Sequence, residues 1–386
     1  MFGAPSTQRS TEPAPRRPGS VTLWARFGRC AAIGAVTLPA GYVLDRLGAP
    51  VPWLLGPLLA GAGLSFATRR PSSMPRAVHS AAQVVLGLAI GLTFPPNAFA
   101  VVGTRLPALV LMVLSTAALS LCNGFLLARW AGVDQVTGFI GSIPGAASSM
   151  VVLSGELGAD ARVVTVLQYW RVMLVAVLAP LAVEHIAPLL AAEPVTGLAS
   201  PSAAAGFELK HTVWFAAYAL VGLTFARLVR LPAGAFLGPF LASVGGTALT
   251  GTRLTMPGWL FAGAMAIVGA SVGVQFDWLT LRRLGRIVLV QTGLVLGLLL
   301  GTAIVGSVFS LLTDVPLITA FLGSTPGAME TMVATAIELG GDPPFVLAMQ
   351  MIRFLFLLLA GPWIVRRLAS RFAYRDEETV AAESGR

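Results

Sequence analysis

Charge is scarce in this sequence. Only 11% of its 386 residues are Asp, Glu, Lys or Arg, less than half of the roughly 25% usual for soluble domains. By contrast, 56% are hydrophobic and 42 more are glycine, and the mean hydropathy is +0.80. This composition excludes a soluble globular protein and predicts an all-α protein that crosses a membrane several times.

Residues that commonly hold metals and cofactors are also few. The chain has two cysteines, Cys30 and Cys122, and three scattered histidines, which offer no disulfide framework and no metal spacing. It has no Gly-rich phosphate loop and no DNA-reading module. We therefore expect no metal, no cofactor and no nucleic-acid partner, and a membrane enzyme is the least favoured class.

Polar composition marks both ends of the chain and its middle. Residues 1–24 are rich in Pro, Ser and Arg, and the linker joining the two halves is rich in Pro, Ala and Ser. A secretory signal is not expected, because the first apolar block begins too late. The predicted organisation is a disordered cytoplasmic arm (1–24), a first membrane repeat (25–190), a linker (191–211), a second membrane repeat (212–369) and a polar cytoplasmic tail (370–386).

The second half of the chain repeats the first at a constant shift of 182 residues. The longest match joins GSIPGAASSMVVLSGELGAD, which begins at Gly141, to GSTPGAMETMVATAIELGGD, which begins at Gly323. The Leu-Gly-Pro element at 55–57 likewise returns at 237–239. A shift without gaps indicates an internal duplication. Each copy contains six apolar segments.

The number of spans in each copy decides how the two copies are oriented. Six spans would leave them parallel, whereas five would invert the second copy. The fifth segment contains Pro144-Gly145 in the first copy and Pro326-Gly327 in the second, and a Pro-Gly pair breaks a helix at membrane depth. We expect these two segments to be re-entrant or broken, which leaves about ten full spans. An odd number of spans does not by itself show which segment of each copy fails to cross.

The basic residues favour the inverted arrangement. Only one of the 26 is a lysine, and basic residues in short loops collect on the cytoplasmic side. Ten spans place outside only Arg46, Arg105, Lys210 and Arg253. Twelve spans would place outside Arg227, Arg230, Arg282, Arg283 and Arg286. We expect a multi-pass protein of a bacterial inner membrane, with both termini cytoplasmic and the linker outside.

Two arginines lie deep inside apolar segments, Arg171 and Arg353. Each follows the start of its segment by about ten residues, or ~14 Å, near the middle of a ~30 Å hydrocarbon core. A glutamine three positions earlier shares the helical face of each arginine. Helices that restart after the Pro-Gly breaks would direct free N–H groups and positive dipole ends at an anion. The candidate substrate site therefore comprises Gln168, Arg171, Gln350, Arg353, Ser142, Gly145, Ser324, Gly327 and Glu330, with Pro144 and Pro326 as helix breakers.

A structural explanation of the arginines stays open beside this one. A guanidinium in lipid is expensive unless it has partners. Each arginine could instead fix helix packing through backbone carbonyls or through an ion pair with Glu156, Glu330 or Glu338. Glu330 replaces Ser148 of the first copy, so the two halves of the site are expected to differ, and one could serve as an ion or regulatory site.

The paired motif GS[IT]PGA…M-V-x4-E-L-G-x-D…Q-x-x-R, with the Leu-Gly-Pro elements, resembles the bacterial AbrB-type family of duplicated inner-membrane proteins. That family is named for an effect on expression of the aidB gene and is often labelled an ammonia monooxygenase. The resemblance covers about residues 27 to 369 and implies a multi-pass membrane protein linked to regulation of gene expression. It carries over no catalytic residues, and copper or iron ligands for monooxygenase chemistry are missing from this chain.

Inverted repeats, midplane arginines and broken segments together favour a secondary transporter or exporter of a small organic anion or zwitterion. The alternative is a membrane-embedded regulator or sensor, which the family label favours. The expected partners are the lipid bilayer and the small anionic or zwitterionic ligand, and homo-oligomerisation stays open. The sequence does not specify the substrate, the coupling ion or the direction of transport.

Overall fold

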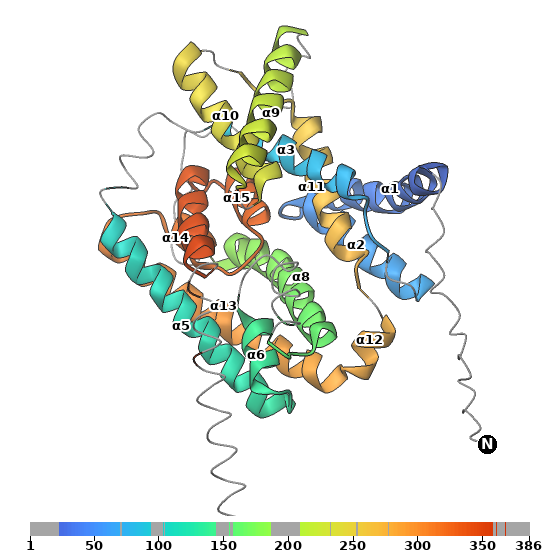
Figure 1. Cartoon of the computed structure of the whole chain (residues 1–386), viewed down its shortest axis with the longest axis vertical. Helices are drawn as coiled ribbons and strands as arrows, with labels where there is room; N and C mark the ends of the chain where they lie inside the picture. Colours follow the sequence, from blue (N-terminus) through green and yellow to red (C-terminus); the bar gives the residue numbers. More distant parts are fainter. Residues whose placement is uncertain are drawn as a thin grey trace, which may run out of the picture.

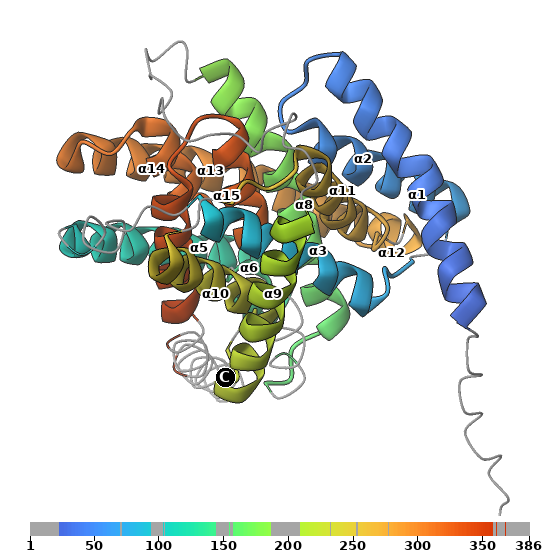
Figure 2. The same ribbon diagram turned by 90° about the horizontal axis from the view of Figure 1, so that it is seen from above.

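The computed structural model describes residues 23–69, 72–93, 103, 105–143, 154, 157–186, 209–231, 233–251, 254–276, 278–357, 360 and 367. Within this part of the chain every regular element is a helix, as the composition predicts. Helices α8 (Ala161–Ile186) and α15 (Met329–Glu338) lie near the centre. Helices α1 (Leu23–Arg46) and α5 (Leu106–Ala131) lie at opposite edges (Figures 1 and 2).

The remaining helices follow the apolar segments of the two copies. Those of the first copy are α2 (Pro52–Thr68), α3 (Arg76–Leu92) and α6 (Gln135–Ser142). Those of the second copy are α9 (Leu209–Val229), α10 (Gly234–Thr250), α11 (Gly258–Gly273), α12 (Trp278–Arg283), α13 (Gly285–Thr313), α14 (Leu317–Ser324) and a last helix, Pro343–Leu357. The apolar pattern does not predict the short α12.

Long apolar helices identify the chain as a helical membrane protein. Among the described residues, four helices are long and apolar enough to cross a membrane: Leu106–Ala131, Ala161–His185, His211–Val229 and Gly285–Thr313. Their outer faces carry large exposed side chains, such as Leu311 at 83% and Leu228 at 79% of full exposure. Exposed apolar surface of this kind is stable against lipid and unfavourable in water.

Helices of one copy pack mainly against helices of the other. The closest pairs are α2 with α11 and α3 with α10, and glycines make these contacts possible. A Cβ at Gly269 of α11 would collide with the carbonyl oxygen of Leu54 in α2, and a Cβ at Gly87 of α3 would collide with that of Phe236 in α10. Glycine at these two positions therefore allows the helices of the two copies to approach closely.

Helices α5 and α13, which are equivalent in the two copies, pack side by side and run antiparallel. Asn123 Nδ2, in the middle of α5, donates to the Leu294 carbonyl of α13 at 3.2 Å. Near the end of α5, the Trp130 carbonyl accepts from Arg286 Nη2 at the start of α13, at 3.2 Å. The end of one helix thus lies at the beginning of its counterpart.

Unusual backbone conformations recur at the shift of the sequence duplication. Among the described residues, every one with positive φ has a counterpart 182 positions away that also has positive φ. The pairs are Gly48 with Arg230, Val51 with Ala233, Arg69 with Gly251, Gly132 with Asp314 and Gly158 with Gly340. Non-glycine residues seldom adopt this conformation, so the two copies share the geometry of their turns and helix ends.

Candidate functional site

The fifth segment of the second copy folds back on itself. Helix α14 ends at Ser324, Thr325–Ala328 are not helical, and α15 begins at Met329. After α15, the backbone N–H of Asp342 donates to Thr319 Oγ1 near the start of α14, at 2.9 Å. The two ends of the segment therefore lie together, and its Pro-Gly tip lies at the far end.

The first copy has the equivalent contact. The backbone N–H of Asp160 donates to Thr137 Oγ1 in α6, also at 2.9 Å. Asp134 caps the start of this helix by accepting from the Thr137 N–H at 2.8 Å. The tip of this segment, with Pro144 and Gly145, lies outside the described residues.

Proline explains why each tip needs a side-chain donor. In a continuous helix the Leu322 carbonyl would accept from the N–H of residue 326, but Pro326 has none. Gln350 supplies the missing donor, because its Nε2 lies 2.9 Å from the Leu322 carbonyl and 3.1 Å from that of Thr325. The amide therefore replaces the backbone bond that the helix break removes.

Arg353 binds the same tip. Its Nη1 donates to the carbonyls of Ser324 and Thr325, both at 3.0 Å, and its Nη2 donates to Gln350 Oε1. Gln350 and Arg353 are 2% and 4% exposed. The structure thus brings together four predicted site residues of the second copy, because Ser324, Gln350 and Arg353 meet at the tip that contains Gly327.

The first copy repeats this network at the shift of 182. Gln168 Nε2 donates to the carbonyls of Ile140, at 2.8 Å, and Ile143, at 2.9 Å. Arg171 Nη1 donates to the Ser142 carbonyl at 3.0 Å, and its Nη2 to Gln168 Oε1 at 2.8 Å. Of the first-copy site residues, only Gly145 lies outside the described part of the chain.

The charge of the arginines exceeds what these contacts require. Carbonyls need donors, which neutral amides provide, and each helix end supplies the equivalent of only about −0.5 charge against each guanidinium. Among the described residues, no carboxylate forms a salt bridge with Arg171 or Arg353. Both guanidiniums are therefore buried cations that no described carboxylate neutralises. A bound anion would supply the missing negative charge.

Buried polar atoms without partners also occur in this region. Within the described chain, Ser142 Oγ, Arg171 Nε and both amide atoms of Gln291 are buried and make no hydrogen bond. Gln291 lies on α13, which packs against α8. Unpaired buried groups of this kind are costly unless water or a ligand binds them. Sequence reasoning missed Gln291, although it is a lone amide in an apolar helix.

Glu330 does not pair with an arginine among the described residues. It lies in the first turn of α15, and its Oε1 accepts from Gln83 Nε2 of α3 at 3.4 Å. Glu338 forms no salt bridge within the described part either. Of the structural explanations for the arginines, the described residues therefore support carbonyl contacts. Glu156 lies outside them.

Asp342, in the turn that follows α15, caps the last helix. Its Oδ1 accepts from the Phe345 N–H at 3.2 Å. Burial raises the pKa of the Asp342 carboxyl above its ordinary value, and the Phe345 N–H and the positive charge of Arg105 act in the opposite direction. Arg105 also lies over the Phe345 ring, 5.9 Å from its centroid, so this turn lies beside the residues that precede α5.

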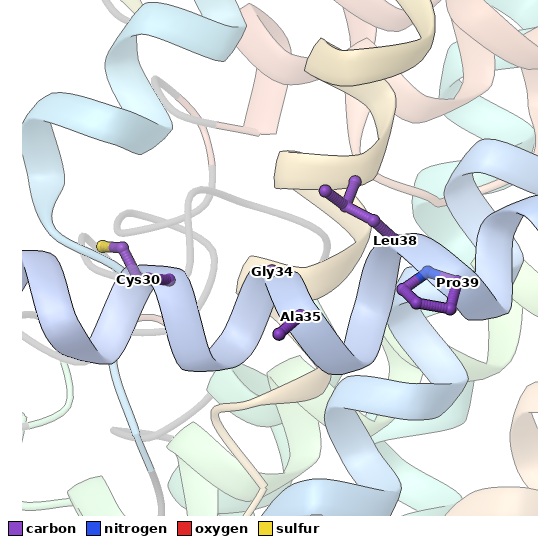
Figure 3. Close-up of a pocket in the computed structure, with 6 residues that line it drawn as sticks. Cys30, Gly34, Ala35, Leu38 and Pro39 are labelled. Atoms are coloured by element: carbon purple, nitrogen blue, oxygen red, sulfur yellow. The ribbon is translucent and has the colours of Figure 1, made fainter.

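A hollow of about 660 Å³ follows the outer face of α1, between Cys30 and Pro39. Figure 3 shows Leu38, Gly34 and Ala35 along it, with no charged side chain. A ligand site normally combines apolar walls with a few placed polar groups, which this hollow lacks. No group of residues that could hold a metal ion occurs in the described chain.

Comparison with known proteins identifies the family of this chain. A family model described as Transition state regulatory protein AbrB matches residues 2–92 and 53–369. The chain belongs to the AbrB family. A protein of Escherichia coli (strain K12) named "Putative regulator AbrB" is 30% identical over 352 residues, covering 87% of this chain and 94% of that protein. Another, "Uncharacterized protein YhjN" of Bacillus subtilis (strain 168), is 26% identical over 360 residues, covering 86% and 91%.

These matches confirm the resemblance that the paired motifs indicate. They extend along most of the AbrB-family chain and of both relatives. The names of the model and of the Escherichia coli protein refer to regulation.

Proposed function

We propose that this protein is a secondary transporter of a small organic anion or zwitterion, which it binds near the membrane midplane between two inverted repeats. The observation that carries the proposal is the pair of buried guanidiniums, Arg171 and Arg353, that bind the tips of turned-back segments with no carboxylate partner in the described chain. Charged groups at membrane depth are expensive and usually functional.

The inversion is supported by helix directions. An inverted second copy requires α5 and α13 to cross in opposite directions, in agreement with their antiparallel packing. It also requires α2 and α11 to run in the same direction. Leu54 lies beside Gly269, and Ser65 Oγ, near the end of α2, donates at 2.7 Å to the Val274 carbonyl at the end of α11. Two parallel copies of six spans would reverse both relations.

Loop contacts support the same topology. Trp130 and Arg286, which are hydrogen-bonded, both lie on the cytoplasmic side in the inverted scheme. The Ser72 N–H donates to the Val274 carbonyl at 2.8 Å, and both of these residues also lie inside. The two turned-back segments then leave about ten full spans. In this scheme the protein lies in the bacterial inner membrane with both termini cytoplasmic.

The chemistry of the site follows from its donors. A carboxylate or phosphate group could accept from the remaining guanidinium N–H groups and from Ser142 Oγ, which makes no hydrogen bond in the described chain. The guanidiniums already lie in fixed positions on the two tips, so binding would cost little side-chain ordering. Rocking of one copy against the other would expose the site alternately to each side.

Flux through the purified protein tests the proposal. Proteoliposomes loaded with unlabelled succinate, lactate or glutamate should take up the same labelled compound by exchange, faster than protein-free vesicles do. Succinate is a dicarboxylate, lactate is a monocarboxylate, and glutamate is an anion that also carries an ammonium group. Exchange of at least one supports a carrier. Absence of exchange for these and for a wider panel of organic anions and zwitterions contradicts it.

A membrane-embedded regulator or sensor is the second candidate, and a specific observation favours it. The matching family model and the Escherichia coli relative both carry regulatory names. A sensor would bind an anion at the arginines without moving it. Binding to the purified protein without flux, together with altered transcription in a deletion strain, would favour the sensor over the carrier.

A further inference from the structure

A second hollow lies where helices of the two copies meet. It has a volume of about 770 Å³ and lies between α3 of the first copy and α9 and α10 of the second, which pack together (Figures 1 and 2). Its wall includes Ala77 and Ala81 of α3, which are exposed, with Leu223 of α9 and Ala235 of α10. The hollow therefore opens to the surroundings of the protein, which in a membrane are lipid chains.

A small side chain of the second copy leaves this space open. At the shift of 182, the counterpart of Ala235 is Trp53, and that of Leu223 is Gly41. A Cβ at Gly41 would lie 3.0 Å from the Trp53 ring, so in the first copy the indole fills the space against α1. The methyl group of Ala235 cannot fill the corresponding space against α9.

The hollow also carries positive charge. Arg227 of α9 lines it, and Arg76 and Arg230 each directly precede a lining residue, Ala77 and Leu231. All three arginines are exposed, and none of them forms a salt bridge within the described chain. In the inverted scheme all three lie on the cytoplasmic side of the membrane.

We propose that this hollow binds an anionic phospholipid of the cytoplasmic leaflet, with an acyl chain along α3 and the phosphate group at Arg227. The inference goes beyond the proposed transport function and does not depend on it. The inverted topology enters only in the choice of leaflet that supplies the lipid.

Both parts of a phospholipid have a matching surface here. The lining residues of α3 run from Ala77 to Val85, about 12 Å at 1.5 Å per residue, which approaches the ~15 Å thickness of one leaflet of hydrocarbon. An extended acyl chain can therefore lie along this wall. The Arg227 guanidinium can donate two parallel hydrogen bonds to phosphate oxygens, and the hydroxyl of Ser80, which also lines the hollow, offers another donor.

Charge favours a lipid over a second copy of the chain as the occupant. A two-fold contact across this hollow would bring the same surface of both copies together, so the arginines of one copy would face those of the other and repel them. An anionic headgroup instead complements these charges. The hollow along α1 has no charged side chain among its described residues, so we expect no preference for anionic lipids there.

Native mass spectrometry of the full-length protein in a neutral detergent tests this binding. Phosphatidylglycerol and phosphatidylcholine with the same acyl chains are added separately, and the parent should bind phosphatidylglycerol about tenfold more tightly. Arg227→Gln should reduce this preference about fivefold, since one basic residue near an anionic headgroup contributes about that factor. Arg283→Gln, a matched change at an exposed arginine of α12, should leave the preference unchanged. Equal affinity of the parent for the two lipids overturns the proposal.

A second pair of variants tests whether the hollow holds the acyl chain. Ala235→Trp introduces the residue of the first copy, which fills the space, and it should weaken phosphatidylglycerol binding at least about fivefold. Ala31→Trp, the matched change in the hollow along α1, should keep the binding of the parent. If Ala235→Trp does not fold, Ala81→Phe at an exposed position of the same wall replaces it.

Undiminished phosphatidylglycerol binding in the variant with a filled hollow overturns the proposal. If that variant instead converts a dimer into a monomer and still binds the lipid, the hollow is an interface between copies of the chain, and the proposal is also wrong. Neither measurement uses a substrate. Absence of exchange in the flux assay would therefore contradict the carrier and leave the lipid site standing, whereas loss of the lipid preference would leave the carrier standing.

Discussion

The two copies agree in one region and differ in another. At the tips of the turned-back segments, the glutamine and arginine of each copy make equivalent bonds, from Gln168 and Arg171 in one and from Gln350 and Arg353 in the other. Where α3 meets α15, Gln83 contacts Glu330. Their counterparts at the shift of 182 are Met265 and Ser148. The tips have therefore kept the contacts that the duplication produced, whereas the contact between α3 and α15 is specific to one copy.

The largest expected effect comes from removing a shared charge. Arg353→Gln should weaken binding of a transported anion roughly 10- to 100-fold, because a hydrogen bond to a charged group contributes about 1.5–3 kcal/mol. Arg353→Lys should restore only part of the loss, since a lysine cannot reproduce the planar fork. Arg171→Gln should have a comparable effect.

Binding isotherms and exchange rates measure these variants, with Arg129→Gln at an exposed position as the control. Arg353→Gln that folds but binds and transports ligand like the parent would show that Arg353 takes no part in substrate binding. A variant that no longer folds would indicate that the carbonyl contacts dominate.

The next comparison concerns the orientation of the copies. In a chain with Cys30 and Cys122 replaced by Ser, Ser200→Cys should react with an impermeant maleimide added outside intact cells. Ser73→Cys, in the turn before α3, should react only after the membrane is opened. If Ser200→Cys is labelled only from the cytoplasm, the two copies are parallel and twelve segments cross.

Packing between the copies can be tested within one helix. Gly269→Ala places a methyl group against the Leu54 carbonyl and should destabilise the protein by about 1–3 kcal/mol. Gly263→Ala, on the same helix, meets no atom within 4 Å and should be nearly neutral. Thermal unfolding followed by the fluorescence of the eight tryptophans measures both. Equal melting temperatures for the two variants would contradict the close packing of α11 against α2.

The smallest effect tests the equivalence of the turned-back segments. Thr137→Val and Thr319→Val each remove one hydroxyl that accepts a backbone N–H at 2.9 Å, and each should cost about 1 kcal/mol. Thr68→Val, which is exposed and bonded within its own helix, is the control. Markedly unequal costs in the same thermal assay would show that the copies differ in this region too.

Much of the fold follows from the sequence. The composition predicts a helical membrane protein, and the duplication predicts that any contact of Arg353 has an equivalent at Arg171. Their placement on the tips also follows, because Pro144 and Pro326 remove backbone donors that the nearby Gln-x-x-Arg motifs can replace. These inferences rely on local spacing, which a sequence displays directly.

Contacts between the copies could not be predicted in the same way. The bond between Gln83 and Glu330 joins residues 247 positions apart, and nothing in the local pattern specifies which face of α3 meets α15. The unpaired amide of Gln291 depends likewise on how α13 packs against α8. Such features depend on tertiary packing, so they required the structure.

Because α2 packs on α11 and α3 on α10, neither half of the chain can complete its own interior. During synthesis the first half enters the membrane before its packing partners have been made, so its glycine faces remain against lipid until the second half follows. Two molecules that complete each other's fold by domain swapping have the same arrangement. A half-length ancestor would have needed a second copy of itself to complete the same interior, and fusion of the two copies would then have placed both in one chain.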